Sequence, residues 1–254
     1  MTSQRADILD TLLSLSRDLG REERALAILG EGNTSAKLSD ETFLVKASGS
    51  SLSALTEADV VECRFAPLLA MLERTDLTDG QIEDELFACR VDPAAKKPSV
   101  EALFHAYFLS LPGIHYVGHT HPISVNQILC STHARDFAAR RMFPDEIVCC
   151  GTKSVFIPYT DPGLKLSQII RTETSSFLEK YQTAPRVVLL ENHGLITLGA
   201  SPSAVQGAMF MSDKAARIFA GAAALGGPKF LSAEDVDRIA NRIDEHYRQR
   251  ALKL

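Results

Sequence analysis

Apolar residues recur at helical spacing near the start of the chain, at positions 8, 9, 12, 13, 15 and 19. This spacing gives an α-helix one apolar face, and the following Gly20 is a residue type that favours a helix end. The segments "NTSAKL" and "TFLVKAS" flank the turn "SDE" and predict a β-hairpin. A third strand is expected at "DVVEC" and a helix over about 65–74. The chain therefore begins as a mixture of helices and strands.

The middle of the chain repeats this alternation. The segment "KPSVEALFHAYFLSL" has Pro98 at an expected helix start and apolar residues at helical spacing after it, which puts Glu101 in the first turn. The dipeptide "PG" then ends this helix before the strand "IHYVGHTH". Further strands are expected at "SVFIPY", "RVVLL" and "LITL". A long helix is expected over residues 201–225 and a last one over 232–252, which opens with a capping box at Ser232 and Asp235.

Strands in hairpins and clusters, separated by helices, favour a mixed or antiparallel sheet over a doubly wound parallel one. We therefore predict an α/β fold with a mixed, mostly antiparallel central sheet flanked by helices. The length of 254 residues is sufficient for one large core, so a single domain over residues 1–254 is expected.

Composition narrows the class of partner. The net charge is −5 and basic residues form no run longer than the pairs at 96–97 and 140–141, which argues against nucleic acid. Charges within the first twenty residues, and the lack of a long apolar run, argue against a signal peptide or a membrane span. Five cysteines without CxxC spacing indicate buried thiols of a reducing compartment. A cytoplasmic protein that binds a small molecule or its own copies is expected.

Two histidines stand one residue apart in "VGHTHP". Residues i and i+2 of a strand share a face, so the imidazoles of His119 and His121 would lie about 7 Å apart along it. Alone, such a pair is more often packed or at the surface. His193 changes this interpretation because it lies in a turn between two apolar strands, next to Gly194. Three neutral imidazoles form a catalytic type of zinc site with an open coordination position.

Two further loops are rich in glycine and small polar residues. "LGEGNTSAK" leads into the first strand and "KASGSSL" follows the second, so their backbone N–H groups and hydroxyls can converge. Such donors suit an anion. Two ordinary Gly/Ser turns remain the alternative, since neither segment has the lysine and following helix of a Walker-type loop.

Taken together and in order, these segments resemble the class II aldolase and adducin-like family, over about residues 5–250. "EGNTS" and "KASG" are similar to its phosphate loops, "KPSVE" to its catalytic-glutamate segment, and "GHTHP" and "ENHG" to its zinc elements. "GNTSAK", "VKASGSSL" and "FPDEIVCCG" look closest to the aldolase part of proteins that join such a domain to a short-chain dehydrogenase. This chain ends before any dinucleotide fingerprint, so it would be the aldolase-like part alone.

The resemblance implies a role for each matching residue. His119, His121 and His193 would hold Zn²⁺, or Mn²⁺ or Co²⁺ in its place, and Glu101 would be the catalytic acid/base. A cyclic homotetramer is implied, in which Tyr247 would serve an active site across a subunit boundary. A second family tyrosine, in the stretch after the zinc pair, has no clear match, since this chain has Phe143 or Asp145 there. The implied phosphate-binding residues are Gly32, Asn33, Ser48, Gly49 and Ser99.

The implied function is a zinc-dependent lyase of carbohydrate metabolism that cleaves a phosphorylated ketose or related hydroxy-keto compound through a metal-stabilised enediolate. Val100 stands where the aldolase pattern has a second serine, which leaves the substrate open. Alternatives are a metal-dependent decarboxylase of a keto acid phosphate, a sugar-phosphate 4-epimerase, and a non-catalytic interaction domain. Glutamate at 101, where the epimerases tend to have aspartate, counts against the epimerase. The retained histidines and glutamate count against the interaction domain.

Overall fold

The computed structural model describes residues 2–254, and the chain divides into two compact units. The first consists of Met1–Gly118 and Thr160–Thr172, and the second of His119–Tyr159 and Glu173–Leu254. The strands are β1 (Asn33–Lys37), β2 (Thr42–Lys46), β3 (Val60–Arg64), β4 (Tyr116–Thr120), β5 (Val155–Ile157), β6 (Val187–Leu190) and β7 (Gly194–Gly199).

The strands form a seven-stranded mixed sheet in the order β3-β2-β1-β4-β7-β6-β5. β1–β2, β2–β3 and β6–β7 pair antiparallel, while β5–β6 pair parallel. The predicted α/β class with a mixed, mostly antiparallel sheet is confirmed. The extent of a single domain over residues 1–254 stays a prediction.

Helices account for most of the remaining chain. Helices α1 (Thr2–Leu19), α2 (Phe65–Met71), α3 (Asp79–Ala88) and α4 (Ala102–Ser110) belong to the first unit. Helix α8 (Leu164–Tyr181) has residues in both units. The second unit contains α5 (Ile123–Leu129), α6 (Ala134–Ala139), α7 (Pro144–Cys150), α9 (Pro202–Ala224), α10 (Ala233–Ala240) and α11 (Ile243–Leu252).

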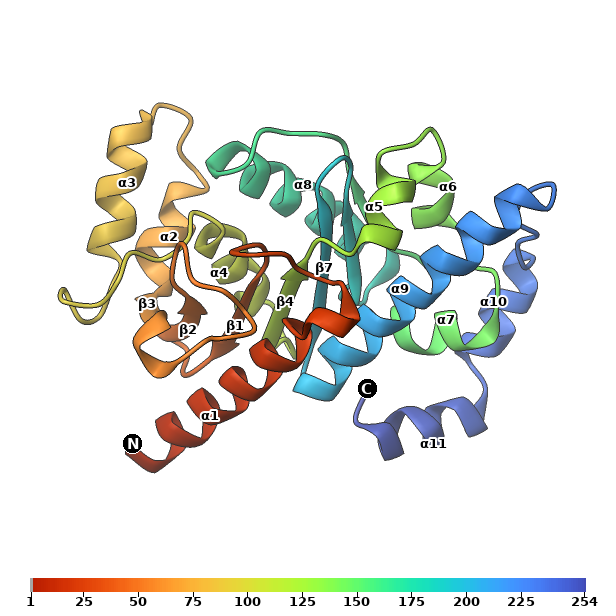
Figure 1. Ribbon diagram of the computed structural model, residues 1–254, viewed down its shortest axis with the longest axis horizontal. Helices are drawn as coiled ribbons and strands as arrows, with labels where there is room; N and C mark the ends of the chain where they lie inside the picture. The colour runs from red at the N-terminus through yellow and green to blue at the C-terminus, as the bar shows by residue number, and fades with distance from the viewer. Residues whose placement is uncertain (1) are drawn as a thin grey trace. The chain divides into compact units, whose positions relative to one another are not determined.

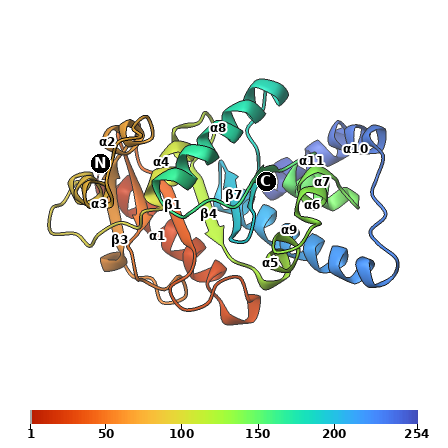
Figure 2. The same ribbon diagram turned by 90° about the horizontal axis from the view of Figure 1, so that it is seen from above.

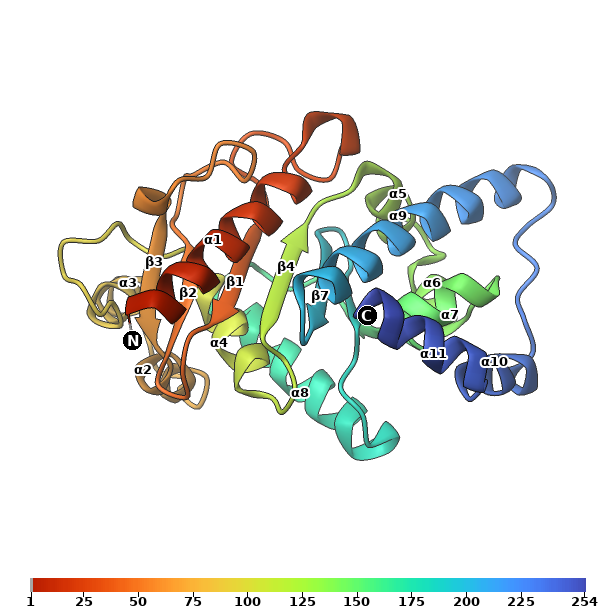
Figure 3. The same ribbon diagram turned by 90° about the horizontal axis from the view of Figure 1, so that it is seen from below.

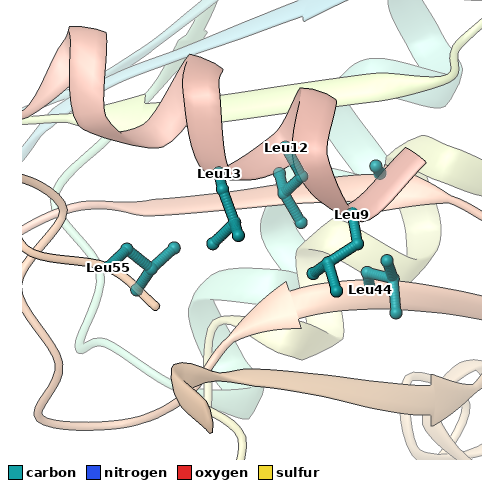
Figure 4. Close-up of a cluster of buried hydrophobic side chains, with 6 residues drawn as sticks. Leu9, Leu12, Leu13, Leu44 and Leu55 are labelled. Atoms are coloured by element: carbon teal, nitrogen blue, oxygen red, sulfur yellow. The ribbon is translucent and has the colours of Figure 1, made fainter. Parts of the chain in front are cut away.

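In the first unit, the apolar face of α1 covers one side of the β1–β2 hairpin. Leu9, Leu12 and Leu13 pack in one cluster with Leu44 and Leu55 (Figure 4). Each leucine buried in this way stabilises the fold by about 1.5–3 kcal/mol relative to an exposed one. The helical spacing seen in the sequence therefore corresponds to the buried face of α1.

Helices α1 and α4 lie on opposite faces of β1 in the first unit (Figure 2). Alternate side chains of a strand point to opposite faces, and β1 shows this directly. The Thr34 hydroxyl lies 2.6 Å from the Ser16 hydroxyl of α1, whereas the Ser35 hydroxyl lies 2.7 Å from His105 Nδ1 of α4. Buried polar groups of β1 thus find partners on both sides.

Helix α4 begins later than expected. Pro98 does not start it but forms a bridge with Ala47 beyond the end of β2, and the helix begins at Ala102. Glu101 is the N-cap residue, and its backbone N–H donates to the Ser99 hydroxyl over 3.3 Å. The predicted position of Glu101 in the first turn is therefore wrong by one residue, because extended pairing holds residues 97–98.

In the second unit, α9 runs along β7 (Figure 1) and also packs against α5 and α7. The last predicted helix, over 232–252, is two helices: α10 ends at Ala240 and α11 begins at Ile243 (Figure 3). The predicted cap is present, since the Ser232 hydroxyl accepts the Asp235 N–H. Arg242 adopts an extended backbone between the two helices and pairs with Asp244, which interrupts the helical run.

The sequence also led us to expect no membrane-spanning segment and buried cysteine thiols. Within residues 2–254, no helix has both the length and the apolar character needed to cross a membrane. Cys63, Cys89, Cys149 and Cys150 are buried thiols, as expected. Cys130 is exposed, so the expectation is wrong there; it is the C-cap residue of α5 rather than part of that helix's buried face.

Candidate metal centre and anion-binding loops

The second unit brings the three predicted histidines together. His119 lies in β4, His121 directly follows that strand, and His193 lies in the turn between β6 and β7. Their ligand nitrogens all lie within 4.8 Å of one another, and the Nε2 atoms of His119 and His121 are 3.0 Å apart. His119 is buried and the other two are half-buried. The cluster is thus enclosed on one side and accessible on the other.

A glycine permits this close approach. A Cβ atom at Gly194 would lie 2.6 Å from the His121 ring, 2.6 Å from the Thr120 carbonyl oxygen and 3.3 Å from the His119 ring. Distances under 3.0 Å are not tolerated between such atoms. Any side chain at this position would therefore push the β6–β7 turn away from the two histidines of β4.

The buried histidine is oriented by the backbone. His119 Nδ1 lies 3.0 Å from the Leu195 carbonyl oxygen, so Nδ1–H donates there and the Nε2 lone pair faces the cluster. Thr120 points the other way, as expected for adjacent strand residues, and its hydroxyl lies 2.9 Å from the Met209 sulfur of α9. The strand thus directs His119 into the cluster and anchors its neighbour on α9.

The turn that carries His193 is held by α5. Asn192 has a left-handed backbone with φ of 55°, which asparagine adopts more readily than most residues. Its N–H donates to the Leu129 carbonyl oxygen over 3.3 Å, and the Asn126 side-chain amide donates to the His193 carbonyl oxygen over 2.9 Å. Asn126 was not expected from the sequence, because it is one of three polar residues in α5, with Ser124 and Gln127, and no local pattern distinguishes it from them.

The residues present fit a divalent metal ion of the zinc type. The three imidazole rings meet edge to face with centroids 4.8, 5.1 and 4.9 Å apart, so their nitrogens converge. Zn²⁺ binds histidine nitrogen at about 2.0–2.1 Å, and three such ligands leave one position open. Neutral imidazole also suits related transition metals.

In the first unit, the two predicted phosphate loops have the backbone that their glycines suggest. Gly32 and Gly49 both have φ of 75°, in the region that favours glycine. Asn33 is buried, and its side-chain oxygen accepts the Thr34 N–H over 2.9 Å. Within residues 2–254, Asn33 Nδ2 has no hydrogen-bond partner although it is buried. A buried donor without a partner is costly, and a bound anion would satisfy it.

The third predicted segment joins these loops. The N–H of Ser48 donates to the Lys97 carbonyl oxygen over 2.9 Å, and the Ala47–Pro98 bridge continues this pairing. The segment that carries Ser99 therefore runs beside the second loop. All five predicted phosphate-binding residues, together with Glu101, belong to the first unit.

Lys46 is a residue of these loops that the sequence analysis missed. Its side chain is 2% exposed, and its ammonium donates to the carbonyl oxygens of Ser50 over 2.7 Å and of Gly30 over 3.4 Å. Burial lowers the pKa of Lys46, while the nearby Glu101 and Asp59 carboxylates oppose this effect. One buried cation thus ties the first loop to the second and lies in the field of Glu101. The alternation of β2 had suggested only a strand residue.

Tyr247 and Asp145 have simpler surroundings. Tyr247 lies on α11 and is 70% exposed. Asp145, in the first turn of α7, pairs with Arg248 of α11 and lies 4.0 Å from Lys214 of α9. This ion pair attaches α11 to α7. The catalytic role implied for Tyr247 stays a prediction.

Comparison with known proteins identifies the family. Residues 10–220 match the family model described as the Class II Aldolase and Adducin N-terminal domain, so the chain belongs to this family. The resemblance seen in the sequence is confirmed.

Three individual proteins are similar to this chain. The uncharacterised oxidoreductase YuxG of Bacillus subtilis is 30% identical over 185 residues, which cover 70% of this chain and 24% of that longer protein. The 3-oxo-tetronate 4-phosphate decarboxylase of Haemophilus influenzae is 29% identical over 185 residues, 72% of this chain and 74% of that protein. A solved structure of an L-fuculose 1-phosphate aldolase has a TM-score of 0.70 at 17% identity, covering 94% of this chain and 96% of its own.

Proposed function

We propose that the protein is a zinc-dependent carbon–carbon lyase that cleaves a phosphorylated ketose or a related hydroxy-keto compound. The observation that supports this most strongly is the cluster of three histidines, whose nitrogens lie within 4.8 Å. The backbone contact that orients His119 and the glycine that admits the β6–β7 turn are what a preorganised metal site requires. Mn²⁺ or Co²⁺ would suit the same ligands.

Each group of residues has a part in the proposed reaction. A divalent ion held by the histidines acts as a Lewis acid, which stabilises the negative charge that develops when the carbon–carbon bond breaks. Glu101 transfers the proton to or from the reacting oxygen or carbon. Gly32, Asn33, Ser48, Gly49 and Ser99 hold the phosphate with backbone N–H groups, the free Asn33 amide and hydroxyls.

A second candidate reaction is decarboxylation of a phosphorylated 3-keto acid. The relative from Haemophilus influenzae supports it, because that protein is a 3-oxo-tetronate 4-phosphate decarboxylase and the similarity covers 72% of this chain. Val100 does not distinguish the two reactions, since the substrates of both carry a phosphate. Both reactions leave electrons on the carbon next to a carbonyl, so they would use the same residues.

A substrate screen distinguishes the two reactions. Purified metal-loaded protein is incubated with ketose 1-phosphates and, separately, with a 3-oxo-tetronate 4-phosphate. An aldolase releases an aldehyde and a three-carbon phosphate, which coupled reductases detect, whereas a decarboxylase releases carbon dioxide. Turnover of neither class by a protein that retains its metal would contradict the proposed function.

The family relationship also supports a homo-oligomer, and we infer a tetramer in which Tyr247 contributes to a neighbouring site. Exposed apolar side chains on α9 and α11, among them Ile218, Ile243 and Tyr247, are compatible with such a contact. Deletion of residues 245–254 should reduce activity far more than metal content, since the metal-binding histidines lie elsewhere. Light scattering that gives a fully active monomer would overturn the tetramer.

A further inference from the structure

A cavity lies within the second unit, and its lining has no part in the proposed reaction. It has a volume of about 490 Å³ and lies between α6, the start of β5 and the C-terminal half of α8. Pockets for small molecules usually have volumes of about 300–1,000 Å³. The α8 residues that line it stand three to four positions apart, so they share one face of that helix. The cavity is thus built by regular structure.

Three cations surround this cavity. Arg135 of α6, Lys153 before β5 and Lys180 of α8 all line it, and Glu173 is the one carboxylate among the lining residues. In the part of the chain that the structure describes, no ion pair joins any of the three cations to a carboxylate. Many other basic residues of the chain do have such partners, for example Arg171 with Glu73. The lining therefore carries three cations against one carboxylate.

Aromatic rings make up the apolar part of the lining. Phe156, Phe177 and Tyr181 are half-buried, and the Phe177 and Tyr181 centroids lie 4.6 Å apart. The Lys153 and Lys180 ammonium groups lie 5.5 Å and 5.3 Å from the centroid of Tyr181. Both lysines are exposed and both ammonium groups lie near the same ring, so an anion at this ring would meet two positive charges.

Another part of the lining suits a planar group. The Arg135 guanidinium lies 4.6 Å from the Phe156 ring centroid, and Arg135 is exposed. A guanidinium stacks on rings with either face, so its second face can receive a planar ring from the ligand. Aromatic side chains and arginine are the groups on which nucleic-acid bases stack, with about 1–3 kcal/mol per base.

From this combination we propose that the cavity is a binding site for a nucleotide. The base stacks among Arg135, Phe156 and Phe177, and the phosphate groups lie between Lys153 and Lys180. The carboxylate of Glu173 accepts a hydrogen bond from a ribose hydroxyl or an amino group of the base. A simple phosphate would leave the rings unused, and a neutral ring compound would leave the cations without a partner.

Isothermal titration calorimetry with ADP tests the site, with adenosine and pyrophosphate as part-ligands at the same ionic strength. We expect ADP to bind at least about tenfold more tightly than either part-ligand, since each lacks one group of contacts. The double variant Lys153→Met/Lys180→Met should lose at least about tenfold in ADP affinity, as expected for two charged hydrogen bonds. Lys165→Met, at an exposed α8 position outside the lining, should bind ADP like the wild type.

The metal centre must be separated from this site, because phosphates also bind metal ions. The variant His119→Ala is therefore titrated with ADP in parallel, and its ADP affinity should equal that of the wild type. Three results would overturn the proposal: no ADP binding, wild-type affinity in the double lysine variant, or pyrophosphate binding as tight as ADP binding. If His119→Ala loses ADP binding while the double lysine variant keeps it, ADP binds at the metal centre and not at the cavity. This result would also overturn the proposal.

Discussion

The three-histidine cluster and the glycine-rich loops are assembled in different ways. The cluster depends on side chains packed at the end of β4 and in the β6–β7 turn, where one added carbon at Gly194 would lie 2.6 Å from two neighbouring atoms. The loops depend on backbone conformation, and the position of a Cβ atom at Gly49 has no neighbour within 4 Å. The histidine cluster therefore leaves no room for a side chain at Gly194, while the second loop is open at Gly49.

This difference has a chemical reason. A metal ion needs its ligand nitrogens within a few tenths of an ångström of fixed positions, so rigid packing around them is an advantage. An anion can be held by several N–H groups and one cation in a looser arrangement. The proposed function thus divides between a rigid element of the second unit and adaptable loops of the first.

Among the variants that leave the metal-binding histidines in place, the largest effect is expected at Glu101. Glu101→Gln keeps the size of the side chain but removes its ability to transfer a proton, so kcat should fall by at least about 100-fold. Metal content and substrate affinity should stay close to the wild type, as metal analysis and titration with substrate would show. Unchanged turnover would leave Glu101 as only the N-cap residue of α4.

Gly194→Ala tests the crowding at the metal cluster. The added methyl group must displace His121 or the turn, which should lower the free energy of unfolding by about 1–3 kcal/mol and weaken metal binding. Urea denaturation and a chelator competition measure the two effects. Gly221→Ala is the control, because its Cβ would lie in open space on α9, and this change should be neutral or slightly stabilising. Equal behaviour of the two variants would contradict the packing argument.

Asn126→Ala tests the hydrogen bond that holds the His193 turn. Loss of the 2.9 Å contact to the His193 carbonyl oxygen should weaken metal affinity by about tenfold or more, as is common for residues that position a metal ligand. The neighbouring Gln127 is exposed on the same helix, so Gln127→Ala provides the comparison and should keep wild-type affinity. Identical metal affinity in both variants would show that the turn needs no support from α5.

The smallest effect is expected in the loops. Lys46→Met removes the buried cation while keeping most of the side-chain volume, so loop geometry should relax. We expect KM for a phosphorylated substrate to rise about fivefold, equivalent to about 1 kcal/mol. Lys96→Met, which loses only a partly exposed pair with Asp59, serves as the control. A rise in KM of the same size in both variants would mean that general charge, rather than the Lys46 contacts, is responsible.

The sequence predicted the parts of the molecule that depend on local patterns. The helical spacing before Gly20, the alternation around "SDE" and the histidines at 119 and 121 all report neighbours in the chain. Asn126 could not be found in this way, because its partner His193 lies 67 positions away. Lys46 could not be found either, because its ammonium binds backbone carbonyl oxygens of Ser50 and Gly30, and a pattern of side chains does not mark such partners. The break at Arg242 was also missed, since helical spacing continues across it at Val236, Ile239, Ile243 and Tyr247.

Metal analysis of the purified protein and three single variants tests the metal centre most directly. Wild-type protein should carry about one zinc-type ion per chain, because three imidazoles complete one site. His119→Ala, His121→Ala and His193→Ala should each lose the ion and the activity while keeping the circular dichroism spectrum of the fold. His133→Ala, at an exposed position outside the cluster, should keep both. Full activity in a protein from which all metal has been removed would contradict the account.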